Sequence, residues 1–150
     1  FGVEEHEKVG YLYKAQGNRA VQTISSVGTY QPMHSTALGK ALLAEFSNER
    51  VHEILDRQGM EQRTENTITG REELFEELAD VRDRGYAIDD QENIRGLRCI
   101  SAPVGGDDTI LGAVSVSGPS SRFNQDRLHE ELPKLMKNTA NVIELNSKYS

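Results

Sequence analysis

Two apolar stretches near the middle of the chain flank a short polar turn. Residues 95–104 and 110–119 are dominated by apolar, β-branched and small side chains, and the segment 105–109 between them is Gly-Gly-Asp-Asp-Thr. Glycine and aspartate favour turns, and two such runs around them are typical of a β-hairpin with a loop longer than the tightest type. We therefore predict that this hairpin is the central strand pair of a sheet.

The second of these predicted strands carries serines on one face. Ser115 and Ser117 share a face with Ala113, and Leu97 and Cys99 share a face of the first strand, because alternate side chains of a strand point the same way. A buried hydroxyl without a partner costs about 1–3 kcal/mol. The serines must therefore bond to nearby backbone or line a polar cavity, and the strand pattern by itself favours backbone bonding.

Four further segments have the apolar period of amphipathic helices and begin at polar residues that can cap a helix. We expect two of these helices to end at Gly59 and Gly85, and the last one to kink near Pro133, because proline removes a backbone donor. The predicted N-caps are Ser35 or Thr36, Ser47, Thr69 in a capping box with Glu72, and Asn124.

Small residues crowd the start of the first predicted helix, after Pro32. Ala37 and Gly39 leave the backbone N–H groups of the first turn open to close approach. A helix start has unpaired N–H groups and a positive dipole end, so this turn can hold a carboxylate without a basic side chain. Small residues can equally serve tight packing on a sheet, and both interpretations stay open. Lys40 is expected to face solvent.

Two shorter patterns complete the sheet. Alternation around residues 16–18 predicts a second hairpin, formed by residues 6–15 and 19–26. Residues 86–93 are predicted to form a short strand that runs into an acidic turn of the kind usually found in solvent. Asp89 lies at the end of that strand, where its carboxylate can accept a hydrogen bond from a ligand hydroxyl or cap the turn. The sequence leaves these two roles open.

Charge and composition exclude several classes of function. The 150 residues fit a single domain, and 24 acidic against 17 basic residues give a net charge of −7, the wrong sign for binding phosphate backbones or anionic membranes. No apolar run approaches the roughly 20 residues that span a bilayer, so we expect a cytoplasmic protein. The single cysteine excludes an internal disulfide, and the four histidines show no metal-ligand spacing, so we expect no metal and no cofactor. A chain that begins at Phe1 suggests a fragment of a longer polypeptide.

Five blocks of sequence carry a family resemblance: residues 32–41, 67–69, 84–92, 96–103 and 115–119. Taken in order and spacing, they resemble the effector-binding domain of the IclR family of transcriptional regulators. The resemblance implies an α+β, GAF-like domain over residues 1–150, with an antiparallel β-sheet flanked by helices and a small-molecule pocket on one sheet face. It also implies a homo-dimer or tetramer, and operator DNA bound only through an N-terminal winged helix-turn-helix domain that is absent from this chain.

The same resemblance selects the residues that would bind the effector, which we expect to be a small carboxylic acid. Backbone N–H groups of Ala37 and Leu38 would capture the carboxylate. The remaining candidates come from the acidic turn and the central hairpin: Asp89, Leu97, Cys99, Ser115 and Ser117. The implied function is therefore ligand sensing by a regulator, without catalysis.

Two alternatives to ligand sensing follow from the same scaffold. One is a GAF-like enzyme that uses Cys99 as a nucleophile or redox thiol. A second cysteine is missing and no histidine is near Cys99 in sequence, although His34 is a possible neighbour in space. A buried strand cysteine is more often a small apolar residue than a reagent. The other alternative is an oligomerisation module that binds no ligand.

Overall fold

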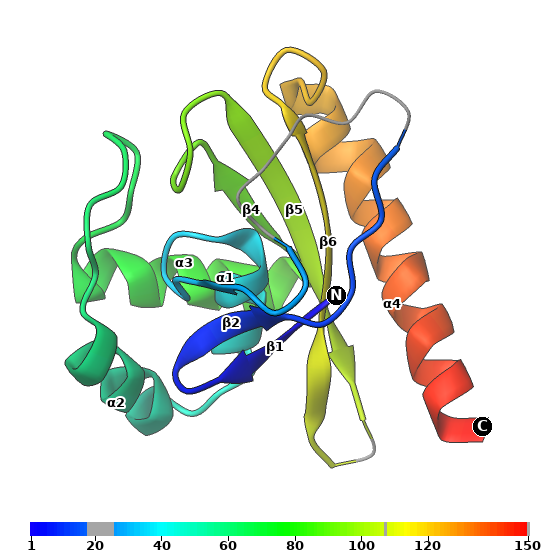
Figure 1. The fold of residues 1–150 in the computed structure, drawn as a ribbon, viewed down its shortest axis with the longest axis horizontal. Helices are drawn as coiled ribbons and strands as arrows, with labels where there is room; N and C mark the ends of the chain where they lie inside the picture. The colour runs from blue at the N-terminus through cyan, green and yellow to red at the C-terminus, as the bar shows by residue number, and fades with distance from the viewer. Residues whose placement is uncertain (18–25, 107, 150) are drawn as a thin grey trace.

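The structure is a computed structural model that describes residues 1–17, 26–106 and 108–149. These residues form an antiparallel six-stranded sheet in the order β3-β2-β1-β6-β5-β4 (Figure 1). The strands are β1 Gly2–Glu5, β2 Lys8–Tyr11, β3 Tyr30–Gln31, β4 Ala87–Asp90, β5 Leu97–Gly105 and β6 Ile110–Pro119. The pair β5–β6 is antiparallel from Leu97–Pro119 to Gly105–Ile110, with one register shift between Val104 and Gly105, and it confirms the predicted central hairpin.

The helices divide between the two faces of the sheet. Their bounds are α1 Ala37–Ala44, α2 Asn48–Gln58, α3 Arg71–Arg84, a π-helical turn η1 Arg127–Glu131, and α4 Leu132–Tyr149. One apolar core joins α1, α2 and α3 to Val9, Ala87 and Ala113 of the sheet. A second core joins α4 to the opposite face through Ile100 and Val104. The predicted α+β sheet flanked by helices is therefore confirmed, and α4 lies along β5 and β6 in Figure 1.

Most helix ends were correctly predicted from the sequence. The side chains of Thr36, Ser47 and Asn124 each accept a hydrogen bond from a backbone N–H three residues further on. The predicted capping box at Thr69 is wrong, because α3 begins one residue later, with Gly70 as an N-cap that makes no side-chain hydrogen bond. The spacing of a capping box fits only when its first residue is the N-cap itself.

The disturbance predicted at Pro133 takes the form of the π-helical turn η1. The N–H of Leu132 donates to the carbonyl of Arg127, five residues back, immediately before the proline. Proline lacks the N–H that an α-helix would use at this point, and a π-turn is a common way to interrupt the hydrogen-bond ladder. Beyond η1, α4 exposes apolar side chains away from the sheet: Leu135, Val142, Leu145 and Tyr149.

The second strand of the hairpin predicted around residues 16–18 falls on residues 18–25, which lie outside the described part of the chain, so that hairpin stays a prediction. Among the described residues, β2 pairs with β1 on one side and with β3 on the other. The turn between β1 and β2 is His6-Glu7, with φ of 54° and 61°. Glycine or asparagine usually occupies such positions, so the sequence carried no signal for this turn.

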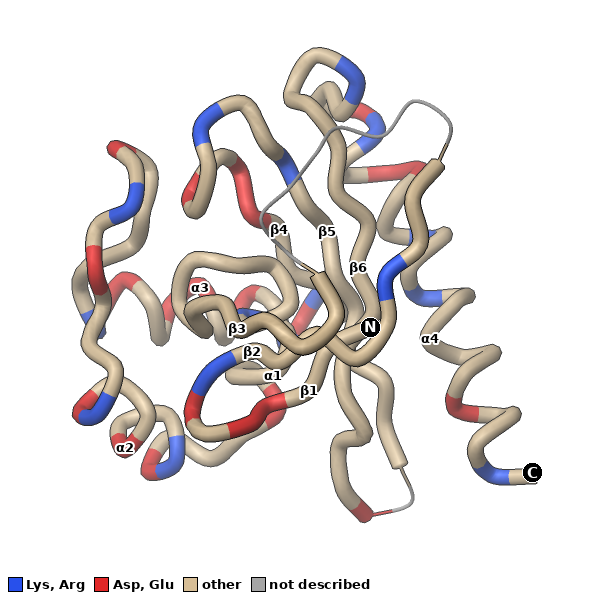
Figure 2. Tube along the Cα trace, in the orientation of Figure 1, with Lys and Arg blue, Asp and Glu red and all other residues tan. Residues whose placement is uncertain are grey.

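Charged residues of both signs are interspersed over the helices and loop ends (Figure 2). Arg50 of α2 lies 3.0 Å from Glu4, and Arg57 lies 3.0 Å from Glu7. These ion pairs join α2 to the β1–β2 hairpin, whose turn residues have positive φ. Some charged surface residues therefore join neighbouring elements through ion pairs, and others are solvated.

Candidate functional site

The start of α1 is held close to the backbone that precedes it. The Thr36 hydroxyl donates to the carbonyl of Pro32 at 2.6 Å and accepts from the N–H of Gly39 at 3.0 Å. A Cβ on Gly39 would collide with the backbone carbonyl of Met33. Glycine therefore permits this close approach, and the small residues of the first turn do serve tight packing, one of the two roles left open by the sequence.

The first turn of α1 also borders a cavity of about 440 Å³, a size suited to a small organic ligand. The structure brings all seven residues predicted from the sequence into the wall of this one cavity. They are Ala37, Leu38, Asp89, Leu97, Cys99, Ser115 and Ser117. Because the N–H groups at a helix start lack partners within the helix, this wall presents donors to an anion.

Three of these side chains form a row across neighbouring strands. Asp89 of β4 is in register with Cys99 of β5, and Cys99 is in register with Ser117 of β6. The Ser117 hydroxyl donates to Cys99 Sγ at 2.9 Å. In the adjacent row, Ser101 donates to the carbonyl of Val114 at 2.9 Å, and Ser115 lines the cavity. The strand pattern alone favoured backbone bonding for Ser115 and Ser117, but both line the cavity.

Several lining residues were missed by the sequence analysis. Tyr11 of β2 and Gln31 of β3 line the cavity from strands at the opposite end of the sheet from β4. Asn93 lines it from the turn after β4. The cavity also continues past β6 to Val116 and Met136 on the α4 side. No local pattern marks Tyr11 or Met136. The acidic turn offered a signal for Asn93, because polar residues were concentrated there.

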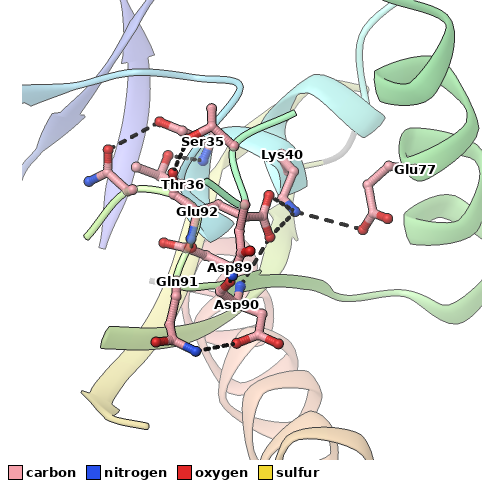
Figure 3. A network of polar contacts seen from close by, with 12 residues as sticks. Ser35, Thr36, Lys40, Glu77, Asp89, Asp90, Gln91 and Glu92 are labelled. Atoms are coloured by element: carbon pink, nitrogen blue, oxygen red, sulfur yellow. Dashed lines mark hydrogen bonds and ion pairs between the residues drawn. The ribbon is translucent and has the colours of Figure 1, made fainter. Parts of the chain in front are cut away.

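The acidic turn is buried, contrary to the expectation of a solvated loop. Asp89 is 2% exposed and Glu92 is 8% exposed, and Lys40, which was expected to face solvent, is 1% exposed. Lys40 Nζ donates to both carboxylate oxygens of Glu92, at 2.8 and 3.0 Å, and lies 3.7 Å from Glu77 of α3 (Figure 3). Buried carboxylates require a cation or hydrogen-bond donors, and Lys40 supplies the cation from inside α1.

Hydrogen bonds fix the turn against α1 and the loop before α3. The N–H of Glu92 donates to Asp89 Oδ1 at 2.7 Å, and the N–H of Asp90 donates to the Glu92 carboxylate at 3.0 Å. Thr67 donates to the carbonyl of Glu92 at 2.6 Å, and Ser35 donates to Asn93 at 3.1 Å. The carboxyl of Asp89 is therefore held in a fixed position on the cavity wall.

The environment perturbs the ionisation of the groups around this wall. Burial, followed by the charge of Glu92, raises the pKa of Asp89 to about 7, although backbone hydrogen bonds and Lys40 act in the opposite direction. Burial also raises the pKa of Glu92 against the opposing effect of Lys40. The pKa of the Cys99 thiol is raised, first by burial and then by Asp89. The cavity thus combines a neutral thiol, hydroxyls and a carboxyl that titrates near neutrality.

This arrangement suits binding better than covalent chemistry. A nucleophilic cysteine needs a lowered thiol pKa and an adjacent base, whereas the pKa of Cys99 is raised. The candidate histidine, His34, bonds through Nε2 to the carbonyl of Glu61 at 2.9 Å. Over residues 1–17, 26–106 and 108–149, no group of three His, Cys, Asp or Glu side chains is placed to hold a metal ion, and no helix is long and apolar enough to cross a membrane.

A curled antiparallel sheet with helices on both faces and a polar cavity beside the start of α1 defines the class of α+β ligand-binding domains. The family described as bacterial transcriptional regulator IclR C-terminal matches residues 1–145. The chain belongs to this family. It is the effector-binding domain of an IclR-type regulator rather than an enzyme, since the relatives it matches are transcriptional regulators.

Individual relatives agree with this assignment. The HTH-type transcriptional regulator KdgR of Dickeya chrysanthemi is 35% identical over 142 residues, which are 94% of this chain and 47% of KdgR. The crystal structure of Thermotoga maritima IclR matches with a TM-score of 0.90 and 30% identity, over 97% of this chain and 59% of that one. The chain spans about half the length of the curated relatives it matches.

A second solved structure contains a ligand. It is a double mutant of the PobR inducer-binding domain from Acinetobacter in complex with 3-hydroxybenzoic acid, with a TM-score of 0.82 and 28% identity over 95% of this chain and 85% of that one. The family resemblance and the GAF-like α+β fold expected from the sequence are confirmed by these comparisons.

Proposed function

We propose that the cavity beside α1 binds a small organic acid whose carboxylate lies at the N–H groups of Ala37 and Leu38. One observation carries this proposal: the donors at the start of α1 and the polar row from Asp89 to Ser117 line the same cavity of about 440 Å³. An acid that also bears a hydroxyl or keto group would satisfy both walls. The aromatic hydroxy acid bound by the PobR domain is a compound of this kind.

The proposed roles of the remaining residues follow from their chemistry. Ser115 and Ser117 would contact polar groups of the effector, because a hydroxyl can both donate and accept. Leu97 and the Cys99 thiol would pack against its apolar part, and Asp89 would face a hydroxyl or a carboxylate oxygen. These assignments give each of the seven lining residues predicted from the sequence a role in carboxylate binding, in polar recognition or in the shape of the cavity.

The full-length protein is proposed to be a cytoplasmic homo-dimer or tetramer that binds operator DNA through an N-terminal winged helix-turn-helix domain. The effector would act by favouring one arrangement of subunits, which requires different affinities in two states. The net charge of −7 disfavours DNA binding by these 150 residues and supports the assignment of DNA binding to another domain. The exposed apolar residues of α4 support self-association.

A thermal-shift screen of the 150-residue domain against carboxylic, keto and hydroxybenzoic acids tests the ligand class. A ligand at 100 times its dissociation constant stabilises the native state by about 2.7 kcal/mol. We expect Ser117→Ala to lose most of the shift, and Ser121→Ala, at an exposed serine outside the cavity, to retain it. If no acid shifts a folded oligomer, the alternative of an oligomerisation module replaces this proposal.

A further inference from the structure

Two carboxylates, those of Glu92 and Glu77, share the buried ammonium group of Lys40, and a third carboxyl, that of Asp89, lies on the cavity wall. Lys40 contacts both oxygens of Glu92 and approaches Glu77, as Figure 3 shows. Asp89 receives the N–H of Glu92 at 2.7 Å. Lys40 therefore pairs mainly with Glu92. Among the described residues, no cation contacts Asp89 to balance the charge of its buried carboxylate.

Groups from several elements face or influence Asp89. Glu92 from the same turn and Lys40 from α1 act on its charge, with opposite sign. Cys99 of β5 and Tyr11 of β2 interact with it from the sheet, and the pKa of both groups is raised, chiefly by burial. Lys14, in the segment after β2, lines the same cavity. None of the groups that act on Asp89 from β2 or β5 is a cation.

A carboxylate ligand adds a second negative charge to this cavity. Two carboxylates in one site of low polarity disfavour each other's ionised form, and one of them then binds a proton. A protonated carboxyl becomes a hydrogen-bond donor, so it can bond to a ligand oxygen that the ionised form would repel. Because Asp89 is buried on the cavity wall and Lys40 contacts Glu92 instead, the proton would reside on Asp89.

We propose that Asp89 takes up one proton from solvent when a carboxylate effector binds, so that the cavity accepts the anion and the proton together. Asp89 is then a specificity-determining residue, and Lys40 and Glu92 are positioning residues that hold it on the wall. This inference rests on the proposed binding of an organic acid. In the bound state the ionised ligand accepts a hydrogen bond from the neutral Asp89 carboxyl. The negative charge of the ligand carboxylate and the positive charge of the proton then cancel, so the net charge of the cavity does not change.

The direction of the pH dependence follows from linkage. The pKa of Asp89 is about 7 in the free domain, and a bound anion raises it further. Between the free and bound pKa values, binding takes up close to one proton, so the dissociation constant rises about tenfold for each pH unit. Below the free pKa, Asp89 is already protonated and the affinity becomes independent of pH.

The first measurement is the titration of Asp89 without ligand. Carboxyl ¹³C NMR of the domain between about pH 4 and pH 9, with the resonance assigned by Asp89→Asn, should give a midpoint near neutrality. A midpoint below about pH 5 would overturn the proposal, because a group with that pKa has little tendency to take up a proton at neutral pH.

The second measurement is calorimetry with 3-hydroxybenzoate and with the acid that gives the largest thermal shift, in buffers of different ionisation enthalpy. We expect uptake of close to one proton above the free pKa. Asp89→Asn should bind with an affinity independent of pH, because the amide imitates the neutral donor. Asp56→Asn, an exposed aspartate on α2, should retain the wild-type dependence.

The outcomes separate this inference from the proposed function. Binding of an acid without proton uptake overturns the role of Asp89 and leaves acid binding intact. The other outcome is an Asp89 titration midpoint near pH 7 with no binding of any acid, even at about pH 5.5 where Asp89 is protonated. That outcome overturns the proposed function and the proton uptake that rests on it.

Discussion

Replacing Lys40 by methionine removes the ammonium group of the buried network while keeping most of the apolar stem of the side chain. In the wild-type domain, the ammonium group contacts both oxygens of Glu92, which remains buried in the variant. The N–H of Asp90 still donates to Glu92, but the negative charge has lost its cation. Glu77 is less affected, since it also contacts Arg84 at 2.9 Å.

The expected loss of stability is large. Removing one partner of a buried ion pair typically costs about 3–5 kcal/mol, because the other charge stays buried without compensation. A domain of this size has a free energy of unfolding of about 5–15 kcal/mol, so the variant should remain folded but marginal. The double variant Lys40→Met/Glu92→Gln removes both charges and should recover about 2 kcal/mol or more of the loss.

The loss should also depend on pH with a definite sign. Burial already raises the pKa of Glu92 in the native state, and removal of Lys40 raises it further. A carboxyl with a raised native pKa destabilises the fold above that pKa, and the penalty disappears as the pH falls below the unfolded value of about 4.3. The difference between variant and wild type should therefore be greatest at about pH 8 and smaller at about pH 5.

Urea unfolding followed by circular dichroism at both pH values measures these differences. Lys134→Met, at an exposed lysine of α4, is the matched control and should change the free energy of unfolding by less than about 0.5 kcal/mol. A cost below about 1 kcal/mol for Lys40→Met at pH 8, or a cost that does not decrease at low pH, would refute the assignment of a compensating ion pair.

Three further outcomes are expected. Gly39→Ala should lower the melting temperature, by an overpacking cost of about 1–3 kcal/mol, because a Cβ meets the backbone of Met33; an unchanged melting temperature would contradict this. Leu145→Glu should weaken self-association in sedimentation velocity, whereas Leu12→Glu, at a similarly exposed leucine (53% against 57%), should not. Cys99 should react with a thiol reagent at pH 7.5 far more slowly in the native domain than in urea, since desolvation on the cavity wall raises the pKa of its thiol; equal rates would contradict the raised pKa.

Local sequence determined the elements that depend on neighbouring residues. The β5–β6 hairpin follows from two apolar runs around a Gly/Asp turn, and the shared face of Leu97 and Cys99 follows from the period of a strand. The caps at Thr36 and Ser47 act over three residues. In each case the interaction joins residues close enough in sequence for a pattern to report it.

Other local features were not signalled. The His6-Glu7 turn lacks glycine or asparagine and is supported by contacts from α2, including that of Arg57 with Glu7. The N-cap of α3 differs from the prediction by one residue, because a capping motif does not specify where the preceding loop leaves the helix. Both features depend on how neighbouring elements meet.

The site itself was decided by tertiary structure. The seven cavity residues could be selected from the sequence only by family resemblance, since the row Asp89–Cys99–Ser117 forms through pairing of three strands. The acidic turn and Lys40 were expected in solvent. Lys40 and Glu92, which are 52 residues apart in sequence, are instead buried and balance each other's charge. A charged residue is stable inside a protein only with a partner in space, and such a partner cannot be identified from local sequence, which is why the ionic interior of this domain became visible only in the folded structure.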